Sequence, residues 1–302
     1  MSASAPKFSV VIPTCGRNDA LALCLDRLAP GDQERMRLVP RQESASLPIA
    51  ETYEVIVTDD GRHATAQEMI RERFSWAHWT AGPARGPAAN RNHGAREAKG
   101  DWFAFTDDDC LPDAGWLAAF AKSAASHESL DVLEGRTYVD RARRHFLESS
   151  PINENGGNLW SCNLCVRRAA FEKLGGFDED FPFAAMEDME FHERLKESHA
   201  RIAFVREAGV LHPWIMQADW PRHFRRHLKS QMIYAQKHPK FFEQKQWFRL
   251  LLRHLRTNLL DFIPNLLRWK GEYLAFAPLH WRACAQEVSA FRRRLKPESI
   301  VV

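Results

Sequence analysis

The stretch GDWFAFTDDDCLPDAGWL, residues 100–117, places three consecutive aspartates directly after a short apolar run. Like charges side by side repel, so a partner must compensate them. Aspartates can cap a following helix, or they can stay solvated in a loop. One aspartate is enough for a cap, however, and a hard divalent cation prefers carboxylate oxygens as ligands. The position of this trio in the fold decides between these interpretations.

The segments around this stretch alternate between expected strands and helices. Strands are expected in KFSVVIP (7–13), YEVIVTDDG (53–61) and DWFAFT (101–106), and helices from Asn18 or Asp19 to about Ala29, near 64–74, before Gly100, and again from near Pro112. This order predicts an α/β fold with a mostly parallel sheet and helices on its faces. Ligands collect at the carboxyl ends of such strands. The pairs Asp59–Asp60 and Asp107–Asp109 both fall there, which favours a binding site over a solvated loop.

The remainder of the chain has a weaker pattern. Residues 30–52 are expected to form a long loop, and further strands are expected near 132–139, 159–167 and 202–205. From Trp220 onward the pattern is helical. The sequence contains no run of about 18 apolar residues, so no membrane-spanning helix is expected. The N-terminus does not resemble a secretory signal. We therefore expect a cytoplasmic protein.

Charge is distributed unevenly along the 302 residues. Residues 222–302 hold 17 of the 42 Lys and Arg but 5 of the 39 Asp and Glu, which leaves 25 basic and 34 acidic residues in 1–221. This split suggests an acidic working domain followed by a basic region that meets an anionic partner. Nucleic acid fits poorly, because no nucleic-acid-binding module accompanies the charge.

Two of the six cysteines, Cys162 and Cys165, form a CxxC motif, but no second pair is present. Structural zinc sites need four ligands. We therefore interpret SCNLCV as part of a strand with half-buried thiols.

Several motifs together resemble glycosyltransferase family 2, which has the GT-A fold. They are FSVVIPTCGR (8–17), VIVTDDG (55–61), ANRNHG (89–94), residues 100–117, NLCVRRAAFEKLGGFDEDF (163–181) and MEDMEF (186–191). The resemblance implies a Rossmann-like GT-A catalytic domain over 1–215, with a nucleotide-binding half to about 112 and an acceptor half from about 113. Residues 216–302 then form a basic α-helical C-terminal region.

The resemblance also assigns roles to residues that would bind the donor nucleotide. Pro13, Thr14 and Arg17 would line the nucleotide pocket after the first strand, and Asp59 with Asp60 would contact the base and ribose. Arg91 and Asn92 would lie along the nucleotide or the diphosphate, and Asp107 and Asp108 complete the set. Within the DxD signature, Asp107 would face the ribose and Asp108 would orient the loop. Asp109 would hold Mn²⁺ or Mg²⁺, with His212 of VLHP as a second ligand.

The pair Glu187–Asp188 carries the expected catalysis. Acids are common in the first turn of a helix, so the pair alone has an ordinary explanation. In the family, the aspartate of this motif acts as general base, which implies that role for Asp188, with Glu187 shaping the acceptor pocket or tuning its neighbour. His93 and His192 are expected on helix surfaces, GGFDEDF as a structural turn, and Asn158 and Trp160 near the acceptor.

The resemblance predicts an inverting transfer of a sugar from a nucleotide-diphosphate donor, by default a UDP-sugar, to a glycan, glycolipid or other hydroxyl acceptor. A sugar-nucleotide nucleotidyltransferase is one alternative, but its glycine-rich basic loop after the first strand is absent. A second alternative is a non-catalytic protein that binds a sugar nucleotide or docks on a membrane. The presence of DDD, ED and His212 together argues against it, because a protein without catalysis need not keep all three.

Two interpretations remain for WFRLLLRHLRTNLLDFIPNLLRWKGEYLAF, residues 247–276. In the first, Leu250, Leu251, Leu255 and Leu259 pack on the catalytic domain. In the second, the helix lies on an anionic membrane at the inner face, with its arginines at the headgroups and Trp247 and Trp269 at the interface.

Overall fold

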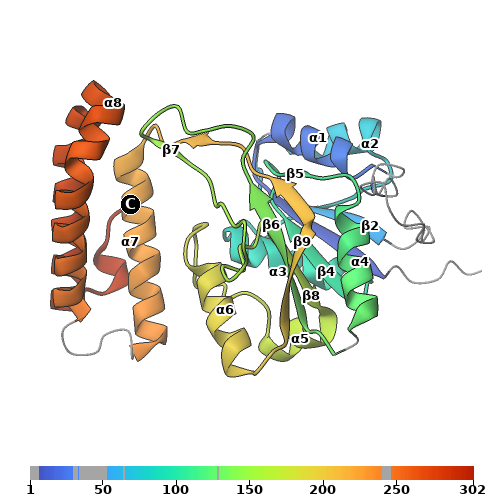
Figure 1. The fold of residues 1–302 in the computed structure, drawn as a ribbon. Helices are drawn as coiled ribbons and strands as arrows, with labels where there is room; N and C mark the ends of the chain where they lie inside the picture. The colour runs from blue at the N-terminus through green and yellow to red at the C-terminus, as the bar shows by residue number, and fades with distance from the viewer. Residues whose placement is uncertain (1–6, 30–32, 34–52, 64, 128, 240–245) are drawn as a thin grey trace, which may run out of the picture. The chain divides into compact units, whose positions relative to one another are not determined.

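The computed structural model describes residues 7–29, 33, 53–63, 65–127, 129–239 and 246–302 (Figure 1). They divide into two compact units. The first comprises the described residues up to Asp140 together with Ser150–Pro213, and the second comprises Arg141–Ser149 and the chain from Trp214 onward. The loop expected over 30–52 lies, apart from residue 33, outside the described residues.

The first unit is built on an eight-stranded sheet. Its strands are β1 (Phe8–Thr14), β2 (Tyr53–Asp59), β3 (His78–Ala81), β4 (Trp102–Thr106), β5 (Leu111–Pro112), β6 (Val132–Tyr138), β8 (Asn163–Arg167) and β9 (Ile202–Leu211). They lie in the order β3-β2-β1-β4-β8-β6-β9-β5. The pairs from β3 to β4 and the β6–β9 pair are parallel, whereas β8 and β5 run antiparallel to their neighbours. The expectation of a mostly parallel sheet is confirmed.

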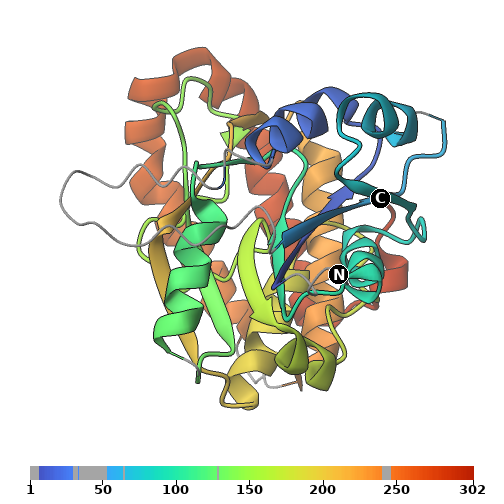
Figure 2. The ribbon, with the colours of Figure 1, turned by 90° about the vertical axis from the view of Figure 1, so that its right-hand side faces the viewer.

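Helices cover both faces of this sheet, because its strands are apolar on both sides. In β1, Phe8, Val10 and Ile12 face one core and Val11 faces the other, as the twofold side-chain period of a strand requires. The first core is closed by α1 (Asn18–Arg27), α2 (Gln67–Arg73) and α4 (Trp116–Ser126), and the second by α3 (Pro87–Glu97), α5 (Arg168–Leu174) and α6 (Glu187–Glu197). Helix α4 packs on β6 and β9 (Figure 2).

The segment around Pro112 differs from the expectation of a helix start. Leu111 and Pro112 form β5, the last strand of the sheet, where Pro112 pairs with Val210. An edge strand tolerates proline because one side of it needs no N–H donor. Helix α4 begins later, at Trp116, after Gly115 with φ of 78°.

The register of the parallel strands brings the acidic clusters to one edge. Thr14 at the end of β1 lies opposite Asp59 at the end of β2, and Val11 lies opposite Phe105 of β4. The carboxyl ends of β1, β2 and β4 therefore form one edge, and the DDD loop leaves β4 at this edge.

The second unit consists mainly of helices. It contains α7 (Trp220–Lys237), α8 (Gln246–Arg293), the 3₁₀ turn Pro297–Ser299, and the short antiparallel pair β7 (Glu148–Ser149) and β10 (Ile215–Met216). Lys270, with φ of 42°, breaks α8 into two arms. Leu228 and Met232 of α7 pack with Leu250 and Phe291 of α8.

The leucines of α8 differ in burial, and Leu250 packs with residues of α7 and α8 within the second unit, so packing of these leucines on the catalytic domain stays a prediction. Leu250 is 9% exposed, but Leu255 and Leu259 are 58% and 78% exposed. The side chain of Trp247 is outside what the structure describes. Among the described helices, none is both long and apolar enough to cross a membrane.

Candidate active site

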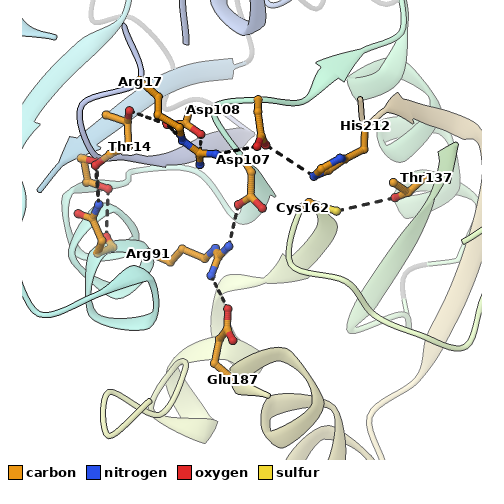
Figure 3. A network of polar contacts seen from close by, with 12 residues as sticks. Thr14, Arg17, Arg91, Asp107, Asp108, Thr137, Cys162, Glu187 and His212 are labelled. Carbon is orange, nitrogen blue, oxygen red and sulfur yellow. Dashed lines mark hydrogen bonds and ion pairs between the residues drawn. The ribbon is translucent and has the colours of Figure 1, made fainter. Parts of the chain in front are cut away.

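Asp107 and Asp108 point to different partners (Figure 3), and Arg17 pairs with both Asp108 and Asp109 Oδ2, the latter at 2.7 Å. Asp108 is fully buried and accepts hydrogen bonds from Thr14 Oγ1 at 2.7 Å and Arg17 Nε at 3.1 Å. Burial, only partly offset by Arg17, raises the pKa of Asp108 to about 6. Asp108 therefore ties the DDD loop to the end of β1 and the start of α1.

Asp109 faces His212, the residue that follows β9. Asp109 Oδ1 lies 3.6 Å from His212 Nε2 and, among the described residues, has no hydrogen-bond partner although it is buried. The other ring nitrogen, Nδ1, lies 2.9 Å from the Pro213 carbonyl, which can only accept, so Nδ1 carries the proton. In the neutral imidazole, Nε2 then offers its lone pair toward Asp109.

These two atoms fit a divalent cation. A ligating histidine usually donates its second N–H to a carbonyl or carboxylate, as Nδ1 does here. Carboxylate oxygen suits Mg²⁺ and Mn²⁺, and neutral imidazole is the commonest metal ligand among side chains. The Cys110 sulfur also lies within 4.8 Å of both ligand atoms, but burial raises the pKa of this thiol, which favours its protonated form. Asp109 and His212 are therefore better suited than Cys110 as ligands of a divalent cation.

Arg91, from α3, connects the DDD loop to the start of α6 (Figure 3). Its Nη2 lies 2.7 Å from Asp107 Oδ1, and its Nη1 lies 3.0 Å from Glu187 Oε1. Arg91 is 2% exposed. Burial alone would raise the pKa of Asp107, but the Arg91 guanidinium lowers it below its usual range. One buried cation thus holds a carboxylate of each acidic motif.

Replacing Arg91 with methionine should destabilise the fold. The change keeps the volume but leaves the Asp107 and Glu187 carboxylates without their cation, and breaking a buried pair costs about 3–5 kcal/mol. Arg96→Met on the same helix is the matched control, since Arg96 is 57% exposed and its 3.5 Å pair with Glu179 contributes at most about 1 kcal/mol. Urea unfolding measures both. Equal midpoints for the two variants would contradict a structural role for Arg91.

Glu187 and Asp188 begin α6 after Met186, which has φ of 72°. Glu187 is buried and its Oε2 has no partner among the described residues. Burial, followed by the charge of Asp188, raises the pKa of Glu187 to about 7. Asp188 is half-buried, accepts a hydrogen bond from the Met189 amide at 2.8 Å, and has its pKa raised mainly by burial. A carboxylate of raised pKa suits proton transfer.

A sequence model of a known family matches residues 9–194, under the description glycosyl transferase family 2. The chain belongs to this family. The resemblance inferred from the motifs is therefore confirmed. The matched residues include the aspartates after β4 and the start of α6.

Two curated relatives are similar to this family 2 chain at low sequence identity. Chondroitin synthase of Escherichia coli is 26% identical over 79% of the chain, and a validoxylamine A glucosyltransferase of Streptomyces hygroscopicus is 25% identical over 80%. The chain spans 39% and 59% of the lengths of these relatives.

The structural likenesses concern the fold alone. A mannosyltransferase of Pyrobaculum calidifontis, solved with GDP-Man and Mn²⁺, is 17% identical, with a TM-score of 0.58 over 96% of this chain and 87% of its own. TarS of S. aureus (residues 1–349), solved with UDP, is 18% identical, with a TM-score of 0.51 over 95% and 90%. The GT-A fold with a helical C-terminal region is confirmed.

The other expected nucleotide-site residues of this family 2 chain make mostly internal contacts. Asp59 is buried and accepts hydrogen bonds from the Gly61 and Ala66 amides and from the Trp79 indole. Asp60, half-buried, accepts from the Ala84 amide. Pro13 lies within β1 opposite Thr58 of β2.

Two asparagines of α3 hold loops around the site. The Asn92 amide bonds the Phe177 backbone at both its oxygen and its nitrogen, and it therefore secures the GGFDEDF turn. Asn90, which sequence reasoning missed, donates to the Thr58 carbonyl at 2.9 Å and thereby fixes the end of β2. His93 of the same helix is half-buried against Thr80.

Glu134 is a second residue that sequence reasoning missed. It is buried in β6 and accepts hydrogen bonds from Asn153 Nδ2 and from the backbone amides of residues 157, 158 and 159, all between 2.7 and 2.9 Å. One carboxylate thus shapes the loop that carries Asn158, which is exposed, and leads to Trp160, which is half-buried. No local pattern marks a lone glutamate in a strand for this role.

Proposed function

We propose that this family 2 chain transfers a sugar from a nucleotide-diphosphate donor, with a UDP-sugar as the default, to an acceptor hydroxyl with inversion at the anomeric carbon. The observation that carries the proposal is the Arg91 bridge. It places the DDD and ED carboxylates on two sides of one buried cation, next to the Asp109–His212 pair.

Asp109 and His212 are the residues that would hold Mn²⁺ or Mg²⁺. When bound, the ion supplies positive charge that stabilises the leaving nucleoside diphosphate. The solved mannosyltransferase with GDP-Man and Mn²⁺ and TarS with UDP support a nucleotide donor and a metal for this fold. Thr14 and Arg17 bind the DDD loop and keep it against β1. The carboxyl end of β2, with Asp59 and Asp60, is the neighbouring strand end.

Asp188 acts as the general base in this proposal. Its carboxylate removes the proton from the acceptor hydroxyl while the hydroxyl oxygen attacks the anomeric carbon opposite the diphosphate, and a single displacement inverts that centre. Glu187 is held in place by its ion pair with Arg91. It lies beside Asp188 in sequence, and each of the two carboxylates disfavours ionisation of the other, so Glu187 tunes the pKa of Asp188.

A thermal-shift screen of UDP, GDP and their sugars, each with and without Mn²⁺, tests the proposal. A ligand at 100 times its dissociation constant stabilises the folded state by about 2.7 kcal/mol. We expect the melting temperature to rise with UDP and Mn²⁺ together, and less with UDP alone. UMP, which lacks the second phosphate, is the matched control. A melting temperature unchanged by every nucleotide in the presence of Mn²⁺ would refute a nucleotide-sugar donor.

We further propose that the first arm of α8 rests on an anionic membrane from the cytoplasmic side and brings the enzyme to a lipid-linked acceptor. Leu252, Leu260 and Leu267 are 50%, 58% and 73% exposed and recur at helical spacing. Arg253, Arg256 and other arginines lie between them in sequence, and each basic residue near an anionic surface adds about 1 kcal/mol of attraction.

Flotation with liposomes checks this contact. The protein should float with vesicles that contain phosphatidylserine or phosphatidylglycerol, and less with pure phosphatidylcholine. Leu260→Gln with Leu267→Gln should reduce flotation, whereas Leu23→Gln, at a leucine of α1 that is also 58% exposed, should not. Wild-type protein that stays at the bottom with anionic vesicles would contradict membrane docking.

A further inference from the structure

The two arms of α8 enclose a groove of about 1170 Å³ in the second unit. Its walls are largely apolar and include Leu255, Leu259, Phe262, Ile263, Trp281 and Val288. Phe262 and Trp281 lie against each other with ring centroids 6.1 Å apart, which holds the arms together. Arg292 and Arg293 line the same groove. A long apolar chain with an anionic head matches this lining.

A nucleophilic cluster lines this groove, far in sequence from the DDD and ED motifs. Cys284 Sγ lies 3.6 Å from His280 Nε2 and accepts a hydrogen bond from Asn258 Nδ2 at 3.8 Å. His254, on the other arm, lines the same groove as Cys284, and its Nε2 lies 2.9 Å from Glu287 Oε2. A thiol, a histidine and a carboxylate that orients the histidine form the arrangement that activates a cysteine.

The charges around Cys284 favour its thiolate. Burial alone would raise its pKa, but the His254 and His280 hydrogen bonds lower it to about 6. The hydrogen bonds to Cys284 and Glu287 raise the pKa of His254 to about 9. The other groups that act on this cluster do so through Glu287. Arg253 and Gln231 of α7 lower the pKa of Glu287. The charge of Glu287 in turn favours the protonated form of His227 of α7, whose pKa burial lowers.

We propose that Cys284 is an S-acylation site, at which the groove binds a long-chain acyl thioester such as an acyl-coenzyme A and transfers the acyl group to the Cys284 sulfur. Neither the sugar-transfer chemistry nor the membrane contact of the exposed leucines requires this thiol. The apolar walls take the acyl chain, and Arg292 and Arg293 take the phosphates of the carrier.

The reaction balances without an oxidant. The Cys284 thiolate attacks the thioester carbonyl carbon and forms a new C–S bond, while the Asn258 amide is placed beside the sulfur to donate to the developing oxyanion. The carbonyl re-forms as the C–S bond to the carrier breaks. The carrier thiolate leaves and takes the proton of the His254 imidazolium, which returns neutral. The product carries a chain next to the exposed Leu259 and Ile263, and a second anchoring signal makes membrane binding stable.

The full chain incubated with palmitoyl-coenzyme A tests the proposal by intact mass and peptide mapping. We expect one palmitoyl group on Cys284 that hydroxylamine removes, and none on Cys15, the exposed cysteine that serves as the internal control. Acetyl-coenzyme A should react at least 10-fold more slowly, because it does not fill the groove. Equal labelling of Cys15 and Cys284, or binding of palmitoyl-coenzyme A without transfer, would overturn the proposal.

Variants separate activation of the thiol from folding. Cys284→Ser should abolish labelling. His254→Gln keeps the thiol in place but should slow acylation about 10-fold or more. The rate of iodoacetamide alkylation against pH provides a second readout: its midpoint should lie near 6 in the wild type and rise toward the usual range for a thiol in His254→Gln. An identical midpoint in the two proteins would show that His254 does not activate Cys284.

Discussion

Asp188→Asn is expected to abolish sugar transfer while it leaves donor and metal binding intact. The amide has nearly the shape of the carboxylate and can still accept from the Met189 backbone amide, so the start of α6 should keep its conformation. It cannot remove the acceptor proton, and the loss of a general base typically costs about 10²–10⁴ in rate. A transfer assay with radiolabelled donor and calorimetry with UDP measure the two halves of the prediction.

Glu193→Gln is the matched control for Asp188→Asn, because Glu193 lies on the same helix and its ion pair with Lys196 is exposed to solvent. Its activity should equal that of the wild type. In the wild type the turnover rate should fall as the pH is lowered through the pKa of Asp188, which burial has raised, since the base must be ionised to act. Normal transfer by Asp188→Asn would rule out this assignment.

Asp109→Ala and His212→Ala are each expected to remove the dependence of UDP binding on Mn²⁺. Each change deletes one of the two proposed ligand atoms, which lie 3.6 Å apart. Loss of a residue that only supports a metal ligand costs 10–100-fold in metal affinity, so loss of a ligand should cost about 100-fold or more. Calorimetry of UDP with Mn²⁺, and again with EDTA, gives the affinities.

Asp101→Ala is the control for the metal experiment, because Asp101 is exposed and precedes the opposite end of β4. It should retain the full Mn²⁺ effect. A His212→Ala variant whose UDP affinity still responds to Mn²⁺ as in the wild type would exclude His212 as a ligand.

The parallel sheet could be predicted because its signal is local. Buried strands such as β1 and β4 are short apolar runs, and the helices between them have recognisable starts and stops. Strand β3, HWTA, was missed because it is polar in part and obtains its conformation from pairing with β2. Pro112 was misplaced for a similar reason, since only its pairing with β9 makes it a strand residue.

The candidate site was predictable in its residues but less so in their contacts. The sequence motifs contain Arg91, Asp107 and Glu187, yet nothing local indicates that one guanidinium bonds both carboxylates across 96 residues. Glu134 and the Cys284 cluster had no motif at all. Their chemistry depends on partners that tertiary structure supplies, such as His254 on the opposite arm of α8.

The Arg91 bridge limits how family members can be recombined. Arg91 belongs to the segment before the DDD loop, and Glu187 lies well after it. A chimera that joins the first hundred residues of this protein to the later segment of a relative would inherit the cation from one parent and its counter-charge from the other. Such a chimera keeps the buried ion pair only if both parents carry the arginine and the glutamate, so donor and acceptor preferences should be exchanged with this pair matched.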